Sequence, residues 1–233
     1  MAARFAGPPL IFPFSKVGEM SRHSSSKLTI AVACLALLLP PAIASGGKFN
    51  RALNIGDKAP EWSGLLGIDG RKHALADYAD AKLIVLVFTC NHCPVATANQ
   101  DRLIGLQKEF LDRGVRLVAI CSNPDDDEDL PAMKERAKNK GYNFPYLRDA
   151  DQSVGRAYGA RQTPTALVLD ADRKMGYMGA IDDHWEDAGR VERDYLRDAI
   201  EALLAGSKVA VPETRPQGCE IPYLERKPPA PAP

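Results

Sequence analysis

The hydrophobic pattern from about residue 54 onward alternates between two kinds of segment. Short apolar runs rich in β-branched residues are typical of buried strands, and LIVLVFT at residues 83–89 is the clearest of them. Its unbroken apolar character indicates a strand that is covered on both faces. Further strands are expected at residues 62–66, 115–122, 165–170 and 176–181.

Segments with apolar residues at helical spacing separate these runs. Helices are expected at residues 94–111, 131–140, 153–158 and 191–205, with glycines 114, 141 and 206 at their ends. Strands that alternate with helices predict an α/β fold with a central mixed sheet flanked by helices. The Asp69-Gly70 pair suits a tight turn and adds an N-terminal β-hairpin.

The first 44 residues are expected to be an N-terminal extension and a secretory signal peptide. An apolar run at residues 28–39 follows Arg22 and Lys27, and a small-residue site ending at Ala44 follows it. This order is typical of a secretory signal, with cleavage expected after Ala44. We therefore expect a secreted or periplasmic protein without stable membrane insertion after cleavage; an uncleaved N-terminal anchor is the alternative.

Changes in composition along the rest of the chain predict a linker, one domain and a tail. Residues 45–53 are expected to be a linker, 54–206 one domain, and 207–233 a tail with Cys219 and a proline-rich end. The 233 residues contain 30 lysines and arginines and 30 aspartates and glutamates, which excludes the basic face of a nucleic-acid binder. Four of the five cysteines follow Ala44, so export would place them where disulfides persist.

The motif Cys90-Asn91-His92-Cys93 stands where the buried strand meets the next helix. The N–H groups and dipole of a helix N-terminus stabilise a thiolate, which is the reactive form of cysteine. This context makes the motif a redox candidate. We expect Cys90 to be the exposed, attacking sulfur and Cys93 the resolving sulfur. Asn91 and His92 are expected to tune the reduction potential.

Two structural interpretations of the same cysteine pair stay open. A zinc site would need two more ligands, and the sequence contains no second C-x-x-C. A purely structural disulfide would close a loop of only two residues and would stabilise the fold little. Redox chemistry explains the motif better and needs no cofactor beyond the disulfide itself.

The Thr163-Pro164 pair directly precedes the strand expected at residues 165–170. A proline before a central strand is costly unless its peptide bond is unusual, so we expect a cis bond here. Beside the cysteine motif, this bond would turn the backbone of Thr163 toward an extended substrate peptide. A trans turn proline is the alternative.

Together these motifs resemble the thioredoxin superfamily. Within it, the chain is similar to the redoxin branch, the alkyl hydroperoxide reductase/thiol-specific antioxidant (AhpC/TSA) family, and to its peroxiredoxin-like members with a thioredoxin-type C-x-x-C. The resemblance spans about residues 54–224. It rests on residues 56–60 (GDKAP), 68–71 (IDGR), 87–94 (VFTCNHCP), 163–164 (TP), 179–183 (GAIDD) and 216–219 (PQGC).

The resemblance implies a thioredoxin-like fold with a redoxin-type insertion, which accounts for the separation of 71 residues from Cys93 to Pro164. It implies dithiol–disulfide exchange, with protein dithiols or disulfides and a thiol electron donor as partners. Cys90 and Cys93 would be catalytic, and Thr163 with Pro164 would hold the substrate chain.

Two other functions are alternatives. The peroxiredoxin pattern places proline and threonine seven and three residues before the reactive cysteine, but Leu86 and Cys90 precede Cys93 at these distances. The Cys93-Pro94 pair does match that pattern and keeps a thiol-dependent peroxidase open. Sco-type copper chaperones place a copper-binding histidine in a loop comparable to that of His184. Cys90, Cys93 and His184 would then bind copper.

Three further features have competing interpretations. Cys219 is a possible third redox cysteine that folds back to the motif, the partner of Cys121, or an uninvolved thiol. Cys121 lies in an apolar run, which is typical of a core residue. The acidic run at residues 125–129 (DDDED) lacks the spacing and central glycine of a calcium loop, so we expect a solvated loop.

Overall fold

The structure is a computed structural model, and it describes residues 46–225. These residues belong to one compact unit. The expected signal peptide, its cleavage site after Ala44 and the proline-rich end lie outside the described residues. Within the described part, no helix is long and apolar enough to cross a membrane.

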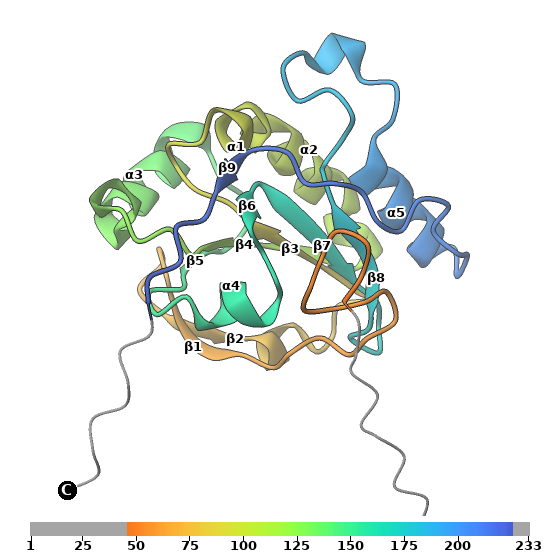
Figure 1. Cartoon of the computed structure of the whole chain (residues 1–233), viewed down its shortest axis with the longest axis horizontal. Coiled ribbons are helices and arrows are strands. Elements are labelled where there is room, and N and C mark those ends of the chain that lie inside the picture. The colour runs from red at the N-terminus through yellow and green to blue at the C-terminus, as the bar shows by residue number, and fades with distance from the viewer. Residues whose placement is uncertain (1–45, 226–233) are drawn as a thin grey trace, which may run out of the picture. The chain divides into compact units, whose positions relative to one another are not determined.

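A mixed sheet of seven strands runs through the middle of this unit (Figure 1). Its strands are β1 (Ser63–Gly67), β2 (Lys72–Ala74), β3 (Leu83–Phe88), β4 (Val115–Cys121), β5 (Tyr146–Arg148), β7 (Thr165–Leu169) and β8 (Met175–Gly179). They lie in the order β2-β1-β5-β4-β3-β7-β8. β3 pairs in parallel with β4 and antiparallel with β7. The expected N-terminal hairpin (β1–β2) and the second hairpin (β7–β8) both form.

Helices cover both faces of the sheet, which confirms the expected α/β architecture (Figure 1). They are α1 (Pro94–Ala98), α2 (Gln100–Phe110), α3 (Leu130–Lys140), α4 (Ser153–Ala157) and α5 (Tyr195–Leu204). A separate two-stranded sheet pairs β6 (Gln162–Thr163) with β9 (Cys219–Glu220). This small sheet brings the C-terminal segment to the residue that precedes Pro164.

β3 is the centre of the core, because its alternate side chains point to opposite faces of the sheet. Val85 and Val87 pack in a cluster with side chains of α2, α3 and α5. Leu86 and Phe88 belong to a second cluster, which α4 and the segment before β1 cover. All six residues of β3 are buried, as its unbroken apolar sequence predicts.

The long helix expected at residues 94–111 is interrupted at Asn99, which separates α1 from α2. The buried side chain of Asn99 donates a hydrogen bond to the carbonyl of Val95 (2.9 Å). Asparagine side chains compete with the backbone in this way, which explains the break. The strands β5, β6 and β9 were not expected, because two or three residues are too few to show a periodic pattern.

The segment before residue 54 is packed against the domain and is not a free linker. Asn50 and Leu53 are both buried. The amide of Asn50 donates to the carbonyl of Tyr158 (2.8 Å), and its side-chain oxygen accepts the N–H groups of Ala52 (2.8 Å) and Leu53 (3.1 Å). A single polar side chain therefore fastens this segment to the end of α4.

The segment after α5 also returns across the domain instead of forming a separate tail (Figure 1). The hydroxyl of Thr214 accepts the N–H of Ala180 (2.8 Å), and the N–H of Thr214 donates to Met178 (3.1 Å). Beyond β9, Ile221 is buried and the hydroxyl of Tyr223 donates to the carbonyl of Ala160. The segment is thus attached on both sides of Cys219.

Replacing Asn50 by alanine tests whether the N-terminal segment belongs to the folded domain. The variant loses three buried hydrogen bonds, so we expect the free energy of unfolding to fall by about 1–3 kcal/mol. The neighbouring Arg51→Ala is a matched control at an exposed position, with an expected change within about 0.5 kcal/mol. Denaturant unfolding measures both changes. Equal stability of the two variants would mean that the segment is not part of the fold.

Candidate redox site

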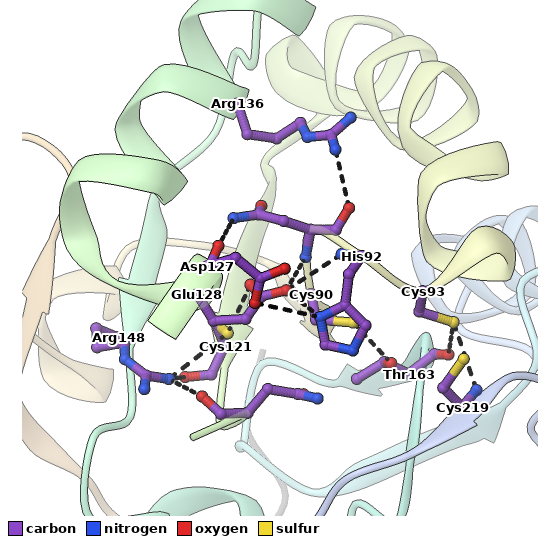
Figure 2. Close-up of polar contacts among 12 residues, drawn as sticks. Cys90, His92, Cys93, Cys121, Asp127, Glu128, Arg136, Arg148, Thr163 and Cys219 are labelled. Carbon is purple, nitrogen blue, oxygen red and sulfur yellow. Dashed lines mark hydrogen bonds and ion pairs between the residues drawn. The ribbon is translucent and has the colours of Figure 1, made fainter. Parts of the chain in front are cut away.

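Cys90 and Cys93 lie at the carboxyl end of β3 and the start of α1, as the sequence predicts. Cys93 is the N-cap of α1, and Pro94 occupies the first helical position. Both thiols are buried, with 1% of Cys90 and 0% of Cys93 exposed. The expectation that Cys90 is an exposed sulfur is therefore wrong. The chain after α5 and the loop before α3 close over the end of the sheet that holds the motif (Figure 2).

Several hydrogen-bond donors converge on the sulfur of Cys93. The thiol of Cys90 makes the strongest of these interactions, and the thiol and N–H of Cys219 and the N–H of Ala96 add to it. The Cys219 nitrogen lies 3.4 Å from the sulfur. Although burial opposes them, these donors lower the pKa of Cys93 below its usual value. As a thiol, Cys93 donates instead to the carbonyl of Thr163 (3.0 Å).

Cys90 shows the opposite shift, because it is the donor to Cys93. This hydrogen bond and burial raise the pKa of Cys90 well above its usual range, and the nearby charge of Glu128 raises it further. The hydroxyl of Thr163, at 3.1 Å, and the N–H of Cys93 act in the other direction. The reduced pair therefore favours a state in which the two sulfurs share one proton, and the donors around Cys93 draw the negative charge toward that sulfur.

Glu128 is the functional residue that the sequence interpretation missed. It lies in the acidic run expected to be a solvated loop, yet its side chain is completely buried. Its carboxylate accepts the N–H groups of Asn91 (2.5 Å) and His92 (3.2 Å), and the imidazole Nδ1 of His92 lies at 2.8 Å. The thiol of Cys121 donates to the other oxygen (3.4 Å). The sequence did contain an indication of this contact. Parallel strands end at the same edge of a sheet, so the acidic run that follows β4 is expected near the cysteine motif that follows β3.

Asn91 and His92, the expected tuning residues, act on the motif indirectly. The side chain of Asn91 donates to the carbonyl of Asp127 (3.1 Å) and accepts the hydroxyl of Tyr146 (3.3 Å). The backbone carbonyl of Asn91 accepts the guanidinium of Arg136 (2.9 Å). His92 is directed at Glu128 (Figure 2). Both residues thus hold the loop against a buried carboxylate.

The Thr163–Pro164 bond is cis, as predicted, and it lies beside the cysteines. Thr163 contacts both of them, through its hydroxyl to Cys90 and its carbonyl to Cys93. Its strand edge, expected to receive a substrate peptide, is taken by the chain's own β9, in which Cys219 pairs with Thr163. The structure therefore brings together Cys90, Cys93, Thr163 and Cys219.

The two remaining cysteines have different surroundings. Cys121 is buried in β4, as expected of a core residue, and burial raises its pKa to about 12. It contacts Glu128 and Arg148. Cys219 instead lies against Cys93 (Figure 2). The structure thus favours the interpretation in which Cys219 folds back to the motif over a pairing of Cys219 with Cys121.

The copper set proposed from the sequence is not assembled. Within residues 46–225, Cys90 forms a group of potential metal ligands with His92 and Glu128, whose ligand atoms all lie within 4.8 Å of one another. His184 does not belong to this group. His184 lies in another loop, where its N–H donates to Asp182 (3.0 Å) and its carbonyl accepts Arg102 (3.2 Å). Cys90, His92 and Glu128 could hold a metal ion by position. The imidazole of His92 and the Glu128 carboxylate already hydrogen-bond to each other, and the thiol of Cys90 contacts the Thr163 hydroxyl.

Comparisons with known proteins agree with this geometry. The sequence profile of the AhpC/TSA family matches residues 55–178. The thiol-disulfide oxidoreductase ResA of Geobacillus thermodenitrificans is 27% identical over 124 residues, which are 53% of this chain and 68% of that protein.

Solved structures extend the comparison to more of the chain. A hypothetical protein of Sinorhizobium meliloti is 31% identical, with a TM-score of 0.70 over 75% of this chain and 97% of that one. A putative thiol:disulfide interchange protein DsbE from Chlorobium tepidum is 22% identical, with a TM-score of 0.54 over 65% of this chain and 99% of that one. The fold is thioredoxin-like, and the matches support a thioredoxin-like redox function.

Replacing Glu128 by glutamine tests its electrostatic effect on the cysteines. In a Cys93→Ser background, we expect Glu128→Gln to lower the pKa of Cys90, because it removes a negative charge that opposes the thiolate. The pH dependence of Cys90 alkylation, followed by mass spectrometry, measures this pKa. Asp127→Asn is the control: its side chain is largely exposed, so solvent screens its charge and we expect no shift. Equal shifts in both variants would contradict the role assigned to Glu128.

Proposed function

The chain belongs to the AhpC/TSA family, and we propose that it is a thiol–disulfide oxidoreductase whose reactive dithiol is Cys90 and Cys93. The observation that supports this most directly is the set of hydrogen-bond donors that meet at Cys93, which lowers the pKa of that thiol. Donors that favour a thiolate beside a second thiol are what rapid exchange with a disulfide requires. The similarity to ResA, whose name states this activity, is further support.

Cys90 is the sulfur that meets the client in this proposal. Cys93 lies beneath the chain that contains Cys219. Asn91 and His92, which follow Cys90, line an open hollow of about 500 Å³ together with Arg136 and other residues of α3. The loop that follows Cys90 thus borders a surface that a client can approach, although the sulfur itself is nearly covered in the resting state.

The exchange begins when Cys90 attacks one sulfur of a client disulfide. The proton of Cys90 passes to the Cys93 thiolate, which already accepts a hydrogen bond from it. The other client sulfur leaves as a thiolate and a mixed disulfide remains. Cys93 gives its proton to that thiolate and attacks Cys90, so the Cys90–Cys93 disulfide forms and the client leaves with both sulfurs reduced. A thiol electron donor returns the pair to the dithiol.

Thr163 and Pro164 position the reacting groups. The Thr163 hydroxyl contacts Cys90, and the Thr163 carbonyl holds Cys93 when Cys93 carries the proton. Asn91 and His92 tune the pair by fixing its distance from Glu128. No cofactor besides the redox disulfide enters this scheme.

We propose that the protein acts outside the cytoplasm, secreted or in a periplasm. The support is the sequence pattern of residues 28–44, in which an apolar run is followed by a small-residue cleavage site. In such a compartment the partners would be exported proteins that carry dithiols or disulfides, together with a thiol donor.

Single cysteine replacements test the roles of the two sulfurs. Cys93→Ser removes the resolving sulfur, so we expect it to accumulate mixed disulfides between Cys90 and client proteins. Cys90→Ser removes the attacking sulfur, and we expect about tenfold less trapped client or none. Non-reducing electrophoresis and mass spectrometry of the trapped species measure both outcomes.

Cys121→Ser is the matched control for this experiment. Cys121 is also a buried thiol, but neither Cys90 nor Cys93 is among the groups that shift its pKa. We expect no trapping by this variant. More trapping by Cys90→Ser than by Cys93→Ser would reverse the roles, and no trapping by either would count against the oxidoreductase.

A thiol-dependent peroxidase is the second candidate, and the lowered pKa of Cys93 beside Pro94 favours it. Peroxide would oxidise the Cys93 thiolate to a sulfenic acid, which condenses with the Cys90 thiol to a disulfide and releases water. Consumption of hydrogen peroxide coupled to a thiol donor measures this activity. We expect Cys93→Ser to abolish it; peroxide consumption that survives this replacement would exclude Cys93 as the peroxidatic residue.

A further inference from the structure

The C-terminal segment occupies the place where an extended client would pair with the domain. In the small sheet, Cys219 is the partner of Thr163, and Glu220 is the partner of Gln162. The N–H of Ile221 donates to Arg161 (2.9 Å), which extends the pairing beyond the two-residue strand. A cysteine of the chain itself therefore lies where a client cysteine would be presented to the motif.

The thiol of Cys219 is directed at Cys93 and at no other described cysteine. Figure 2 shows the sulfurs of Cys93 and Cys219 close together beside the carbonyl oxygen of Thr163. The hydrogen bond to Cys93 raises the pKa of Cys219 to about 11, with burial as a smaller cause. This shift depends on the negative charge of Cys93, so the cause disappears when Cys93 is in a disulfide.

Cys93 is the middle member of the three cysteines. It interacts with Cys90 on one side and with Cys219 on the other. Within residues 46–225, the three sulfurs do not all lie within 4.8 Å of one another. Cys93 can therefore bond to either neighbour, whereas a direct bond between Cys90 and Cys219 has no support in this arrangement.

The backbone around Cys219 is fixed by close contact with Thr163. Gly218 has a φ of 141°, and a Cβ built on it would lie 1.9 Å from the Thr163 carbonyl oxygen. Only glycine lets the chain pass this close. Hydrogen bonds of Thr214 on one side and of Tyr223 on the other hold the ends of the crossing segment. Cys219 is thus presented to Cys93 by a fixed strand.

We propose that Cys219 is a third redox cysteine that forms a disulfide with Cys93, as an alternative to the Cys90–Cys93 disulfide. The inference rests on the proposed dithiol–disulfide exchange at Cys90 and Cys93. In the step, Cys219 attacks the sulfur of Cys93 in the Cys90–Cys93 disulfide. The Cys93–Cys219 bond forms, the Cys90–Cys93 bond breaks, and the proton of Cys219 passes to Cys90. No electrons are gained or lost.

The consequence is that an oxidised protein can present Cys90 as a free thiol. The protein remains oxidised by two electrons, but the disulfide now joins Cys93 to Cys219. The thiol donor would then reduce a disulfide between the domain and its C-terminal segment. The C-terminal segment thereby becomes part of the redox machinery.

Peptide mapping of the oxidised protein tests the inference. After equilibration with oxidised glutathione, free thiols are blocked and the protein is digested with trypsin. Cys90 and Cys93 share the peptide 83–102, Cys121 lies in 117–134, and Cys219 lies in 209–226, because trypsin does not cut before Pro216. A Cys90–Cys93 bond leaves the peptides separate, whereas a bond from Cys93 to Cys219 links 83–102 to 209–226.

We expect Cys90→Ser protein to form the linked peptide as its main oxidised species, and Cys93→Ser protein to form at least about tenfold less of it. Cys90→Ala replaces Cys90→Ser if the serine variant does not fold. Equal linkage in the Cys90 and Cys93 variants would overturn the assignment of Cys93 as the partner. No linkage in the Cys90 variant, with Cys90–Cys93 still formed in the wild-type protein, would overturn the inference alone. Absence of any disulfide in the wild-type protein would overturn the proposed function as well.

Gly218→Ala tests the role of the strand without removing a thiol. Its added methyl group cannot fit against Thr163, so we expect the linked peptide in a Cys90→Ser background to fall about tenfold. Gln217→Ala, at the exposed neighbouring position, is the matched control and should leave the linkage unchanged. Full linkage in the Gly218→Ala variant would mean that the strand does not present Cys219.

Discussion

A thiolate can exist on the buried sulfur of Cys93 only because hydrogen-bond donors from separate parts of the chain meet there. An isolated charge in a protein interior is costly, and pairing with donors offsets that cost. The donors are the thiol of Cys90 at the end of β3, the N–H of Ala96 in α1, and the thiol and N–H of Cys219 in β9. The other elements of the site bring these donors to Cys93. β3 carries one donor, the start of α1 supplies the next, and the crossing segment after α5 delivers the last.

The buried carboxylate of Glu128 adds to the difference between the two thiols, which arises mainly from the hydrogen bond between them and from burial. It accepts N–H groups from the loop that contains the motif, so it holds the loop in place while its negative charge faces Cys90. A charge on Cys90 is opposed by Glu128, whereas a charge on Cys93 is stabilised by its donors. The asymmetry of the two thiols thus arises from their different neighbours. It explains why the pKa values of two cysteines three residues apart in sequence shift in opposite directions.

The sequence predicted those parts of the site that local patterns encode. The buried run at residues 83–89 followed by C-x-x-C, and the cis bond at Pro164, depend on neighbours in the sequence, and the structure confirms both. The burial of Glu128 could not be read from an acidic run, because it results from the pairing of β4 with β3. The packing of the segment before residue 54 and of the chain around Cys219 could not be predicted for the same reason: Asn50 reaches Tyr158 across 108 positions, and Cys219 reaches Cys93 across 126. Polar segments look free in a sequence when the partners that bury them are far away.

In the proposed exchange a covered dithiol reacts with protein partners, and the C-terminal segment explains how burial and reaction can be compatible. The pairing of β9 with β6 involves two residues on each strand, and a typical intramolecular hydrogen bond contributes about 0.5–1.5 kcal/mol net. Local separation of so short a ladder costs far less than unfolding the domain, since β3 and its neighbours are untouched. The anchors at Thr214 and Tyr223 would keep a separated strand close to Thr163. The same segment can therefore shield the Cys93 thiolate at rest, supply one of its hydrogen bonds, and give way when a client competes for the edge. In the proposed exchange, a client that pairs with Thr163 would have to displace a strand already in place, which would favour chains that pair well with this edge.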